Sequence, residues 1–212
     1  MSAKVSKDHL RRRDNFWPQE LIPPVAGLKT ANPEDRMDSL DKLFEETLRD
    51  IYYAEKKILK ALPKMAKKAT SPKLAKAFEM HVGETEGQVE RLEQVFEIIG
   101  KAPRGKTCPA IDGLIEEGQE IMKEAQDDMV RDAGMLAAAQ AVEHYEITRY
   151  GTLRSWAGKL GMNDAAKLLD ATLKEEKATD LKLTDLAESE INIEADDEGG
   201  RASARKTAGS RR

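Results

Sequence analysis

The strongest constraint on the fold is a set of long segments in which apolar residues recur every three or four positions. Within residues 38–69, for example, Leu48, Ile51 and Tyr52 follow this spacing, which places apolar side chains on one face of an α-helix. The same spacing is found over residues 71–99, 110–125, 128–160 and 163–190. No segment alternates apolar and polar residues, as a half-buried strand would. The chain is therefore predicted to be all-α, with four long helices and one shorter helix.

Turn and capping residues separate these segments. Ser71 followed by Pro72 is typical of a helix start, and Gly100 and Gly161 follow two predicted helix ends. Asn163 is expected to cap the last helix.

The lengths of the connections predict the topology. Short turns join the first long helix to the second and the third to the fourth, so each pair is expected to be antiparallel. The 28 residues between the second and third long helices include the short helix, which at 1.5 Å per residue reaches about 24 Å and can cross the bundle. Two hairpins joined by one long crossover form a ferritin-like four-helix bundle rather than an up-down-up-down bundle.

The two ends of the chain differ from this body in composition. Residues 1–36 hold four of the eight prolines and no sustained periodicity, which predicts an extended N-terminal arm, although disorder is an equal alternative. Residues 37–195 are expected to form the bundle, and residues 196–212 a disordered basic tail. The net charge is −4 for the chain and −11 for residues 37–198, so the body is acidic. The tail is expected either to be solvated or to make weak, salt-dependent contact with nucleic acid or an acidic partner.

Composition also excludes several classes of protein. No apolar run approaches the ~18 residues of a membrane span, and the N-terminus lacks the apolar core of a secretory signal. A single cysteine, Cys108, excludes an internal disulfide framework and a cysteine-rich zinc site. We therefore expect a cytoplasmic protein.

Each long predicted helix carries ionisable residues within its apolar face, close to its midpoint. They are Glu55 in the first, His81 and Glu84 in the second, Glu143 and Glu146 in the third, and Glu175 in the fourth, where Glu176 is an alternative. If the midpoints lie level, one layer of the bundle collects a carboxylate from every helix. Burying several unpaired carboxylates costs several kcal/mol or forces protonation, and bound cations relieve the repulsion. The alternative for any one of these glutamates is an ordinary solvated position.

The spacing of these residues favours two metal ions. His81 and Glu84 are three residues apart and share a helix face, as do Glu143 and Glu146. A glutamate from each of two helices and such a pair from each of the other two is the ligand set of di-iron and di-manganese bundles. Carboxylate-rich ligation suits iron or manganese better than zinc or copper. We expect two iron ions per chain, with manganese as the alternative, and we expect His144 at the surface, at an interface or beside the ligands.

The same segments resemble a known family. The stretches LRDIYYAEKKILKALPKMA, HVGETEGQVERLEQVFEIIG and AVEHYEITRYGTLRSWAGKLG are similar to the YciE/YciF family of ferritin-like bacterial stress proteins, and the resemblance covers residues 38–195. It implies a dimetal centre, a homodimer, and induction under osmotic or oxidative stress. It places the metal ligands at Glu55, His81, Glu84, Glu143, Glu146 and Glu175.

The sequence departs from classical ferritins in its ligand motifs. Their Glu-x-x-His order is reversed here, since His81 precedes Glu84, and the fourth predicted helix contains no histidine. These departures argue against rapid iron oxidation by this chain.

Three functions fit these observations. The first is a dimetal protein in which ferrous iron reduces peroxide or oxygen, with Tyr52 and Tyr150 orienting the ligands. The second is a non-enzymatic structural or interaction protein whose tail contacts DNA or a partner protein. The third is a manganese catalase-like enzyme that uses the same site.

Overall fold

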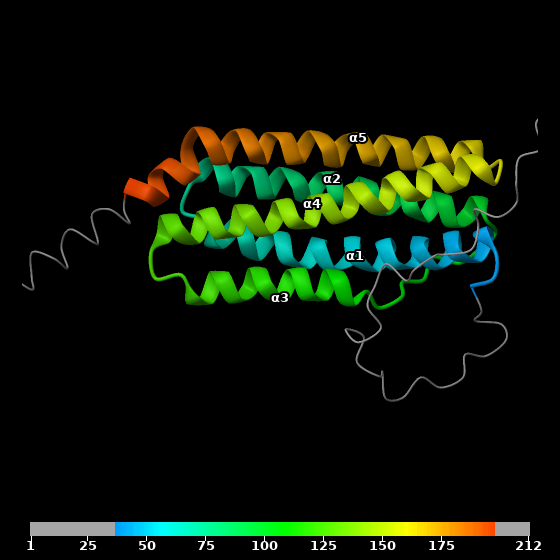
Figure 1. The fold of residues 1–212 in the computed structure, drawn as a ribbon, viewed down its shortest axis with the longest axis horizontal. Helices are drawn as coiled ribbons and strands as arrows, with labels where there is room; N and C mark the ends of the chain where they lie inside the picture. Colours follow the sequence, from blue (N-terminus) through cyan, green and yellow to red (C-terminus); the bar gives the residue numbers. More distant parts are fainter. Residues whose placement is uncertain (1–36, 198–212) are drawn as a thin grey trace, which may run out of the picture. The chain divides into compact units, whose positions relative to one another are not determined.

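The computed structural model describes residues 37–197, which form a bundle of helices without a strand (Figure 1). Its elements are α1 (Leu40–Lys68), α2 (Pro72–Ile98), α3 (Pro109–Glu124), α4 (Asp128–Lys159), α5 (Asn163–Leu186) and a π-helical turn, η4 (Ala187–Ile191). The predicted all-α class is confirmed. The predicted boundaries agree within two residues, except that helical structure after α5 continues to residue 197. The predicted arm, residues 1–36, and residues 198–212 of the predicted tail lie outside the described part of the chain.

The long helices form two antiparallel hairpins, α1 with α2 and α4 with α5. Helix α2 also packs on α5 and α1 on α4, so the four surround the core in the order α1, α2, α5, α4. Helix α3 packs against α4 and α1 at the outside of the bundle and runs back along it, from the end of α2 to the start of α4 (Figure 1). This is the ferritin-like arrangement that the connection lengths predicted.

Local signals set several helix ends. The Ser71 hydroxyl accepts a hydrogen bond from the amide of Leu74 at 3.4 Å, and Pro72 fills the first position of α2, as predicted. Gly100 and Gly161 have φ angles of 67° and 76°, a left-handed conformation that glycine adopts without the strain caused by a Cβ atom.

The predicted cap at Asn163 is wrong. Asn163 is already the first residue of α5, and Met162 occupies the cap position without a side-chain hydrogen bond. The reason is that the carbonyl of Met162 accepts the first bond of the helix, from the amide of Ala166 at 3.0 Å.

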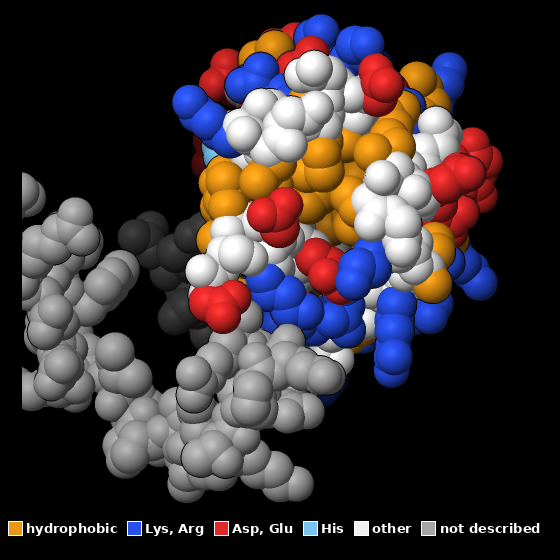
Figure 2. All heavy atoms as spheres, turned by 90° about the vertical axis from the view of Figure 1, so that its right-hand side faces the viewer, with side chains coloured by type: hydrophobic (Ala, Val, Ile, Leu, Met, Phe, Trp, Pro, Cys, Tyr) orange, Lys and Arg blue, Asp and Glu red, His pale blue; other side chains and the backbone are white. Residues whose placement is uncertain are grey.

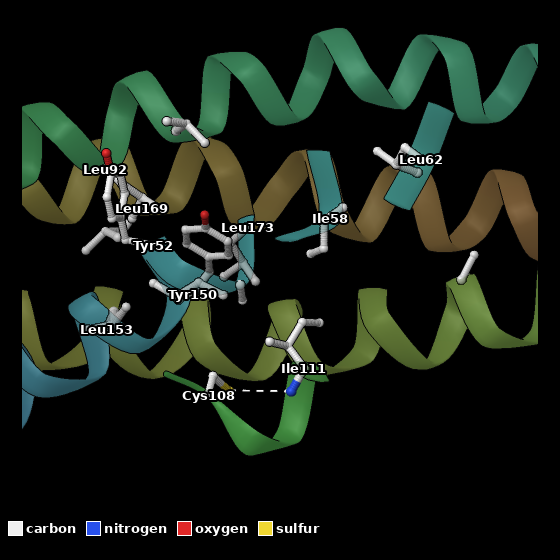
Figure 3. Close-up of a cluster of buried hydrophobic side chains, with 14 of the residues drawn as sticks. Tyr52, Ile58, Leu62, Leu92, Cys108, Ile111, Tyr150, Leu153, Leu169 and Leu173 are labelled. Carbon is white, nitrogen blue, oxygen red and sulfur yellow. Dashed lines mark hydrogen bonds between the residues drawn. The ribbon is translucent and has the colours of Figure 1, made fainter. Parts of the chain in front are cut away.

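Large apolar side chains fill the core in the half of the bundle where α1 begins and α2 ends. Large side chains there are at most 1% exposed; they include Phe44, Leu48, Ile51, Leu92, Phe96, Leu153 and Leu169. The rings of Tyr52 and Phe96 meet edge to face, with centroids 5.5 Å apart. Figure 3 shows Leu92, Leu153 and Leu169 together in this half. We call it the packed half.

Apolar surface remains on the outside of the bundle. Figure 2 views the end at which α1 begins, where hydrophobic side chains gather at the centre and charged side chains surround them. Met37, just before α1, and Ile98, at the end of α2, are 59% and 44% exposed. Within residues 37–197, no helix combines the length and apolar character that crossing a membrane requires.

Candidate metal centre

A layer of buried ionisable side chains crosses the middle of the bundle. It consists of Glu55 from α1, His81 from α2, Glu143 and Glu146 from α4, and Glu176 from α5, each at most 6% exposed. We call this set the carboxylate layer. One ligating atom from each of its members other than Glu55 can be chosen so that all four lie within 4.8 Å of one another. These four residues lie on α2, α4 and α5, and α1 contributes Glu55, which interacts with Glu143 and Glu146 of α4.

Few hydrogen bonds hold the carboxylate layer. Tyr150 donates its hydroxyl hydrogen to Glu55 Oε1, and His81 Nε2 lies 3.2 Å from Glu143 Oε1. Six buried carboxylate oxygens have no hydrogen-bond partner among the described residues: Glu55 Oε2, Glu143 Oε2, both oxygens of Glu146 and both oxygens of Glu176. Buried polar atoms are almost always paired, because leaving them unpaired costs their full desolvation energy. The chemistry of this donor set therefore fits a bound cation.

Burial also shifts the proton affinities of the glutamates. It raises the pKa of Glu55 to about 7, although the hydrogen bond from Tyr150 opposes this change. Burial, reinforced by the neighbouring carboxylates, raises the pKa values of Glu146 and Glu176 well above their usual range. Without a cation, the layer therefore retains protons near neutral pH that a metal ion would have to displace.

His81 responds to its two acidic neighbours. Burial alone would lower its pKa, but hydrogen bonds to Glu143 and Glu84 outweigh burial and raise the pKa to about 10. In the metal-free layer, His81 is therefore a cation that offsets part of the carboxylate charge. A metal ion would take over that role and release the proton of His81.

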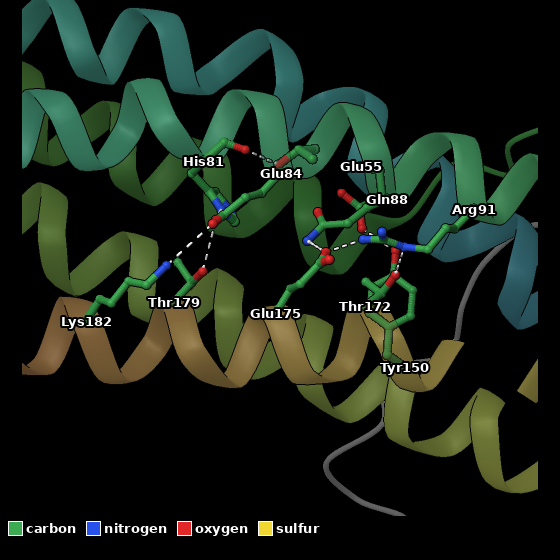
Figure 4. A network of polar contacts seen from close by, with 11 residues as sticks. Glu55, His81, Glu84, Gln88, Arg91, Tyr150, Thr172, Glu175, Thr179 and Lys182 are labelled. Carbon is green, nitrogen blue, oxygen red and sulfur yellow. Dashed lines mark hydrogen bonds and ion pairs between the residues drawn. The ribbon is translucent and has the colours of Figure 1, made fainter. Parts of the chain in front are cut away.

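On α5, the carboxylate layer contains Glu176, whereas the sequence analysis had placed Glu175 first. Glu175 has a side chain that is 37% exposed and forms an ion pair with Arg91 outside the layer (Figure 4). Adjacent helical residues point about 100° apart, so only one of the two can face the core. The inward face is fixed by the buried residues Thr172 and Thr179, one turn to either side of Glu176.

Glu84 lies at the edge of the carboxylate layer. Its side chain is 31% exposed, and its Oε2 atom lies 3.3 Å from His81 Nδ1. Oε2 also accepts a hydrogen bond from Thr179 at 3.2 Å, and Lys182 Nζ lies 3.4 Å from Oε1 (Figure 4). The hydrogen bond to His81 is the main reason that the pKa of Glu84 falls to about 2. Glu84 is therefore linked to the carboxylate layer by its hydrogen bond with His81.

The two tyrosines singled out by the sequence behave differently. Tyr150 is fully buried and bonds Glu55, whereas Tyr52 donates to Glu93 at 2.8 Å, away from the layer. His144 lies at the surface with its side chain 69% exposed, and its Nε2 atom is 3.2 Å from Asp180 Oδ1.

Sequence reasoning missed a polar network on the α2–α5 side of the layer. Arg91 donates to the Thr172 hydroxyl at 2.9 Å and pairs with Glu175, and Gln88 donates to Glu175 at 3.5 Å (Figure 4). The available signal was that Gln88 and Arg91 continue the helical spacing of His81 and Glu84 along α2.

Comparisons with known proteins agree with this architecture. The family model described as a domain of unknown function, DUF892, matches residues 39–196. Protein YciF of Escherichia coli strain K12 is 49% identical over 162 residues, which cover 76% of this chain and 97% of that protein. The crystal structure of the E. coli stress protein YciF matches with a TM-score of 0.71 and 48% identity, covering 74% of this chain and 99% of that one. The structure of YcfI from Rhodopseudomonas palustris matches with a TM-score of 0.70 and 49% identity, covering 72% and 96% of the two chains.

Proposed function

The chain belongs to the DUF892 family and is a relative of YciF, and we propose that in this protein the carboxylate layer is a dimetal centre that reduces peroxide or oxygen. The observation that carries the proposal is the set of six buried carboxylate oxygens without a partner. The description of YciF as a stress protein supports a role in stress, and peroxide is a substrate that fits such a role.

The ligands of the proposed centre are Glu55, His81, Glu143, Glu146 and Glu176. Four ionised glutamates carry four negative charges, which two divalent cations balance while His81 becomes a neutral ligand. An oxygen-rich set with one imidazole favours iron, with manganese as the alternative. When bound, ferrous iron supplies the electrons for the reduction.

The rest of the chain positions these ligands. Tyr150 holds one oxygen of Glu55 by its hydroxyl, which leaves Oε2 as the free ligand atom. Glu84 holds Nδ1 of His81, so that Nε2 faces Glu143 and the layer. The apolar side chains packed around much of the layer lower the local dielectric constant, which strengthens the electrostatic interactions within the site.

The test measures metal content in the full-length protein after metal removal and anaerobic reloading with ferrous iron or manganese. We expect about two ions per chain in the wild type and a clear loss in Glu146→Gln, because a buried amide oxygen replaces a charged ligand. Glu175→Gln is the matched control: it is the same change at the adjacent, partly exposed glutamate outside the layer and should retain both ions. Equal metal content in Glu146→Gln and the wild type would overturn the proposal.

A second measurement addresses redox chemistry. Adding peroxide to the iron-loaded wild type should oxidise the iron and consume peroxide, and Glu146→Gln should lose this reaction. If two ions bind but do not react with peroxide or oxygen, the layer is a structural metal site. The homodimer implied by the family resemblance is tested separately by light scattering on the same samples.

A further inference from the structure

One half of the bundle contains a cavity that opens to the surface. Beside the carboxylate layer, toward the α1–α2 turn, lies a cavity of about 260 Å³ with walls from all five helices. Its lining is chiefly apolar and includes Leu62, Phe78, Leu114, Met122, Ala139 and Leu183. His81, Glu84 and Glu143 lie where the cavity meets the carboxylate layer. An apolar cavity of only ~150 Å³ stays dry and binds benzene, so this space is large enough to hold an apolar ligand.

Lysines also line the cavity, and two of them lack an acidic partner. Lys73 pairs with Glu190, and Lys182 lies near Glu84. Lys64 and Lys76, in contrast, are exposed and make no ion pair with any described residue.

The two unpaired lysines are close in the fold. Lys64 on α1 and Lys76 on α2 lie six residues to either side of Thr70 in the turn, so the antiparallel hairpin brings them to the same level. They belong to a stretch, residues 56–78, that contains eight lysines and no aspartate or glutamate, within a body of net charge −11. A charge sum over the whole body conceals this basic hairpin, which places positive potential next to the apolar cavity.

We propose that the cavity binds a single-chain anionic amphiphile, a medium-chain fatty acid, with its carboxylate on Lys64 and Lys76 and its alkyl chain inside. An apolar wall with unpaired cations beside it is complementary to such a molecule at both ends. An uncharged apolar molecule would leave the lysines unused, and a peptide helix exceeds the volume. None of the groups that hold the ligand belongs to the carboxylate layer, so the proposal is independent of the metal centre.

The first test titrates dodecanoate into metal-free full-length protein by calorimetry. Replacing both unpaired lysines in Lys64→Gln/Lys76→Gln should weaken dodecanoate binding about tenfold, since two exposed charge contacts are lost. The control Lys67→Gln/Lys68→Gln removes the same charge from exposed positions of the same hairpin that do not line the cavity, and it should bind as the wild type does. Dodecanol, which carries no charge, should bind both double variants with equal affinity.

The second test fills the cavity. Ala139→Phe places a ring in the space and should abolish binding of both dodecanoate and dodecanol, with folding checked by circular dichroism. If that variant does not fold, Ala77→Leu at a partly exposed wall position replaces it.

Several results would overturn the proposal: absence of dodecanoate binding to the wild type, wild-type binding in the filled variant, or equal weakening by the control pair. Binding to phosphatidylglycerol vesicles without dodecanoate binding would instead assign the lysines to a membrane surface, which also overturns it. Since the protein is metal-free throughout, none of these outcomes affects the metal proposal.

Discussion

The two halves of the bundle on either side of the carboxylate layer share the same long helices but differ in how their interiors are filled. Both halves bury large residues almost completely, such as Phe44 and Phe96 in the packed half and Leu74 and Met135 in the other. In the other half, the helices surround a cavity of about 260 Å³. Small residues contribute to its wall: Ala61, Ala77, Gly118, Ala138 and Ala139. Periodicity therefore decides where apolar residues go, and their sizes decide whether the space between helices is filled.

The largest expected effect compares truncation of a leucine in each half. Leu48→Ala in the packed half should lower the free energy of unfolding by about 4 kcal/mol, because full packing contacts are lost and a new cavity forms. Leu183→Ala on the cavity wall should cost about 2 kcal/mol, since that side chain already lacks neighbours on one side. Urea unfolding measures both values. Equal losses would show that the cavity half is as tightly packed as the other.

The next effect concerns the layer that divides the two halves. The raised pKa of Glu55, about 7, means that the folded state retains a proton that the unfolded state releases above its ordinary value of 4.5. This contribution to stability is present at low pH and is lost as pH rises toward 7. The pKa of His81 is raised from 6.5 to about 10, so its contribution to stability is also lost as the pH rises, over the interval between these two values.

Metal-free protein should therefore lose a few kcal/mol of stability between pH 5 and pH 9, seen as a falling melting temperature. Protein saturated with metal should show a weaker or reversed trend, because the cation replaces the protons. A melting temperature of the metal-free protein that rises over this range would contradict the burial of the layer. Glu84 has the opposite pH dependence. Its pKa is lowered from 4.5 to about 2, so its contribution to stability is present above about pH 4.5 and is lost as the pH falls toward 2.

The smallest effect separates two adjacent glutamates. In metal-free protein, Glu176→Gln should raise stability by about 1 kcal/mol, because folding above the ordinary pKa of a glutamate requires Glu176 either to take up a proton or to bury a charge, and glutamine requires neither. Glu175→Gln breaks a partly exposed ion pair with Arg91 and should change stability by about 0.5 kcal/mol. Thermal unfolding of both variants at pH 8 provides the comparison. A larger change in Glu175→Gln would reverse the assignment of which residue faces the layer.

The sequence by itself determined the helices, their connections and the level of the polar layer. The periodic segments, Ser71-Pro72 and the two glycines are local signals, so the helix boundaries could be read without knowledge of neighbouring helices. The positions of Glu55, His81, Glu143 and Glu146 followed from apolar stripes interrupted near their midpoints.

Only the tertiary structure decided which side chains meet. The choice of Glu176 over Glu175 depends on the rotation of α5, which its packing against α2 and α4 sets and which two nearly equal apolar stripes leave open. The edge position of Glu84 depends in the same way on its contacts with Thr179 and Lys182 of the neighbouring helix. The cavity could not be predicted from the sequence either. Its volume depends on the sizes of residues from all five helices together, and no single segment shows it in its hydrophobic pattern.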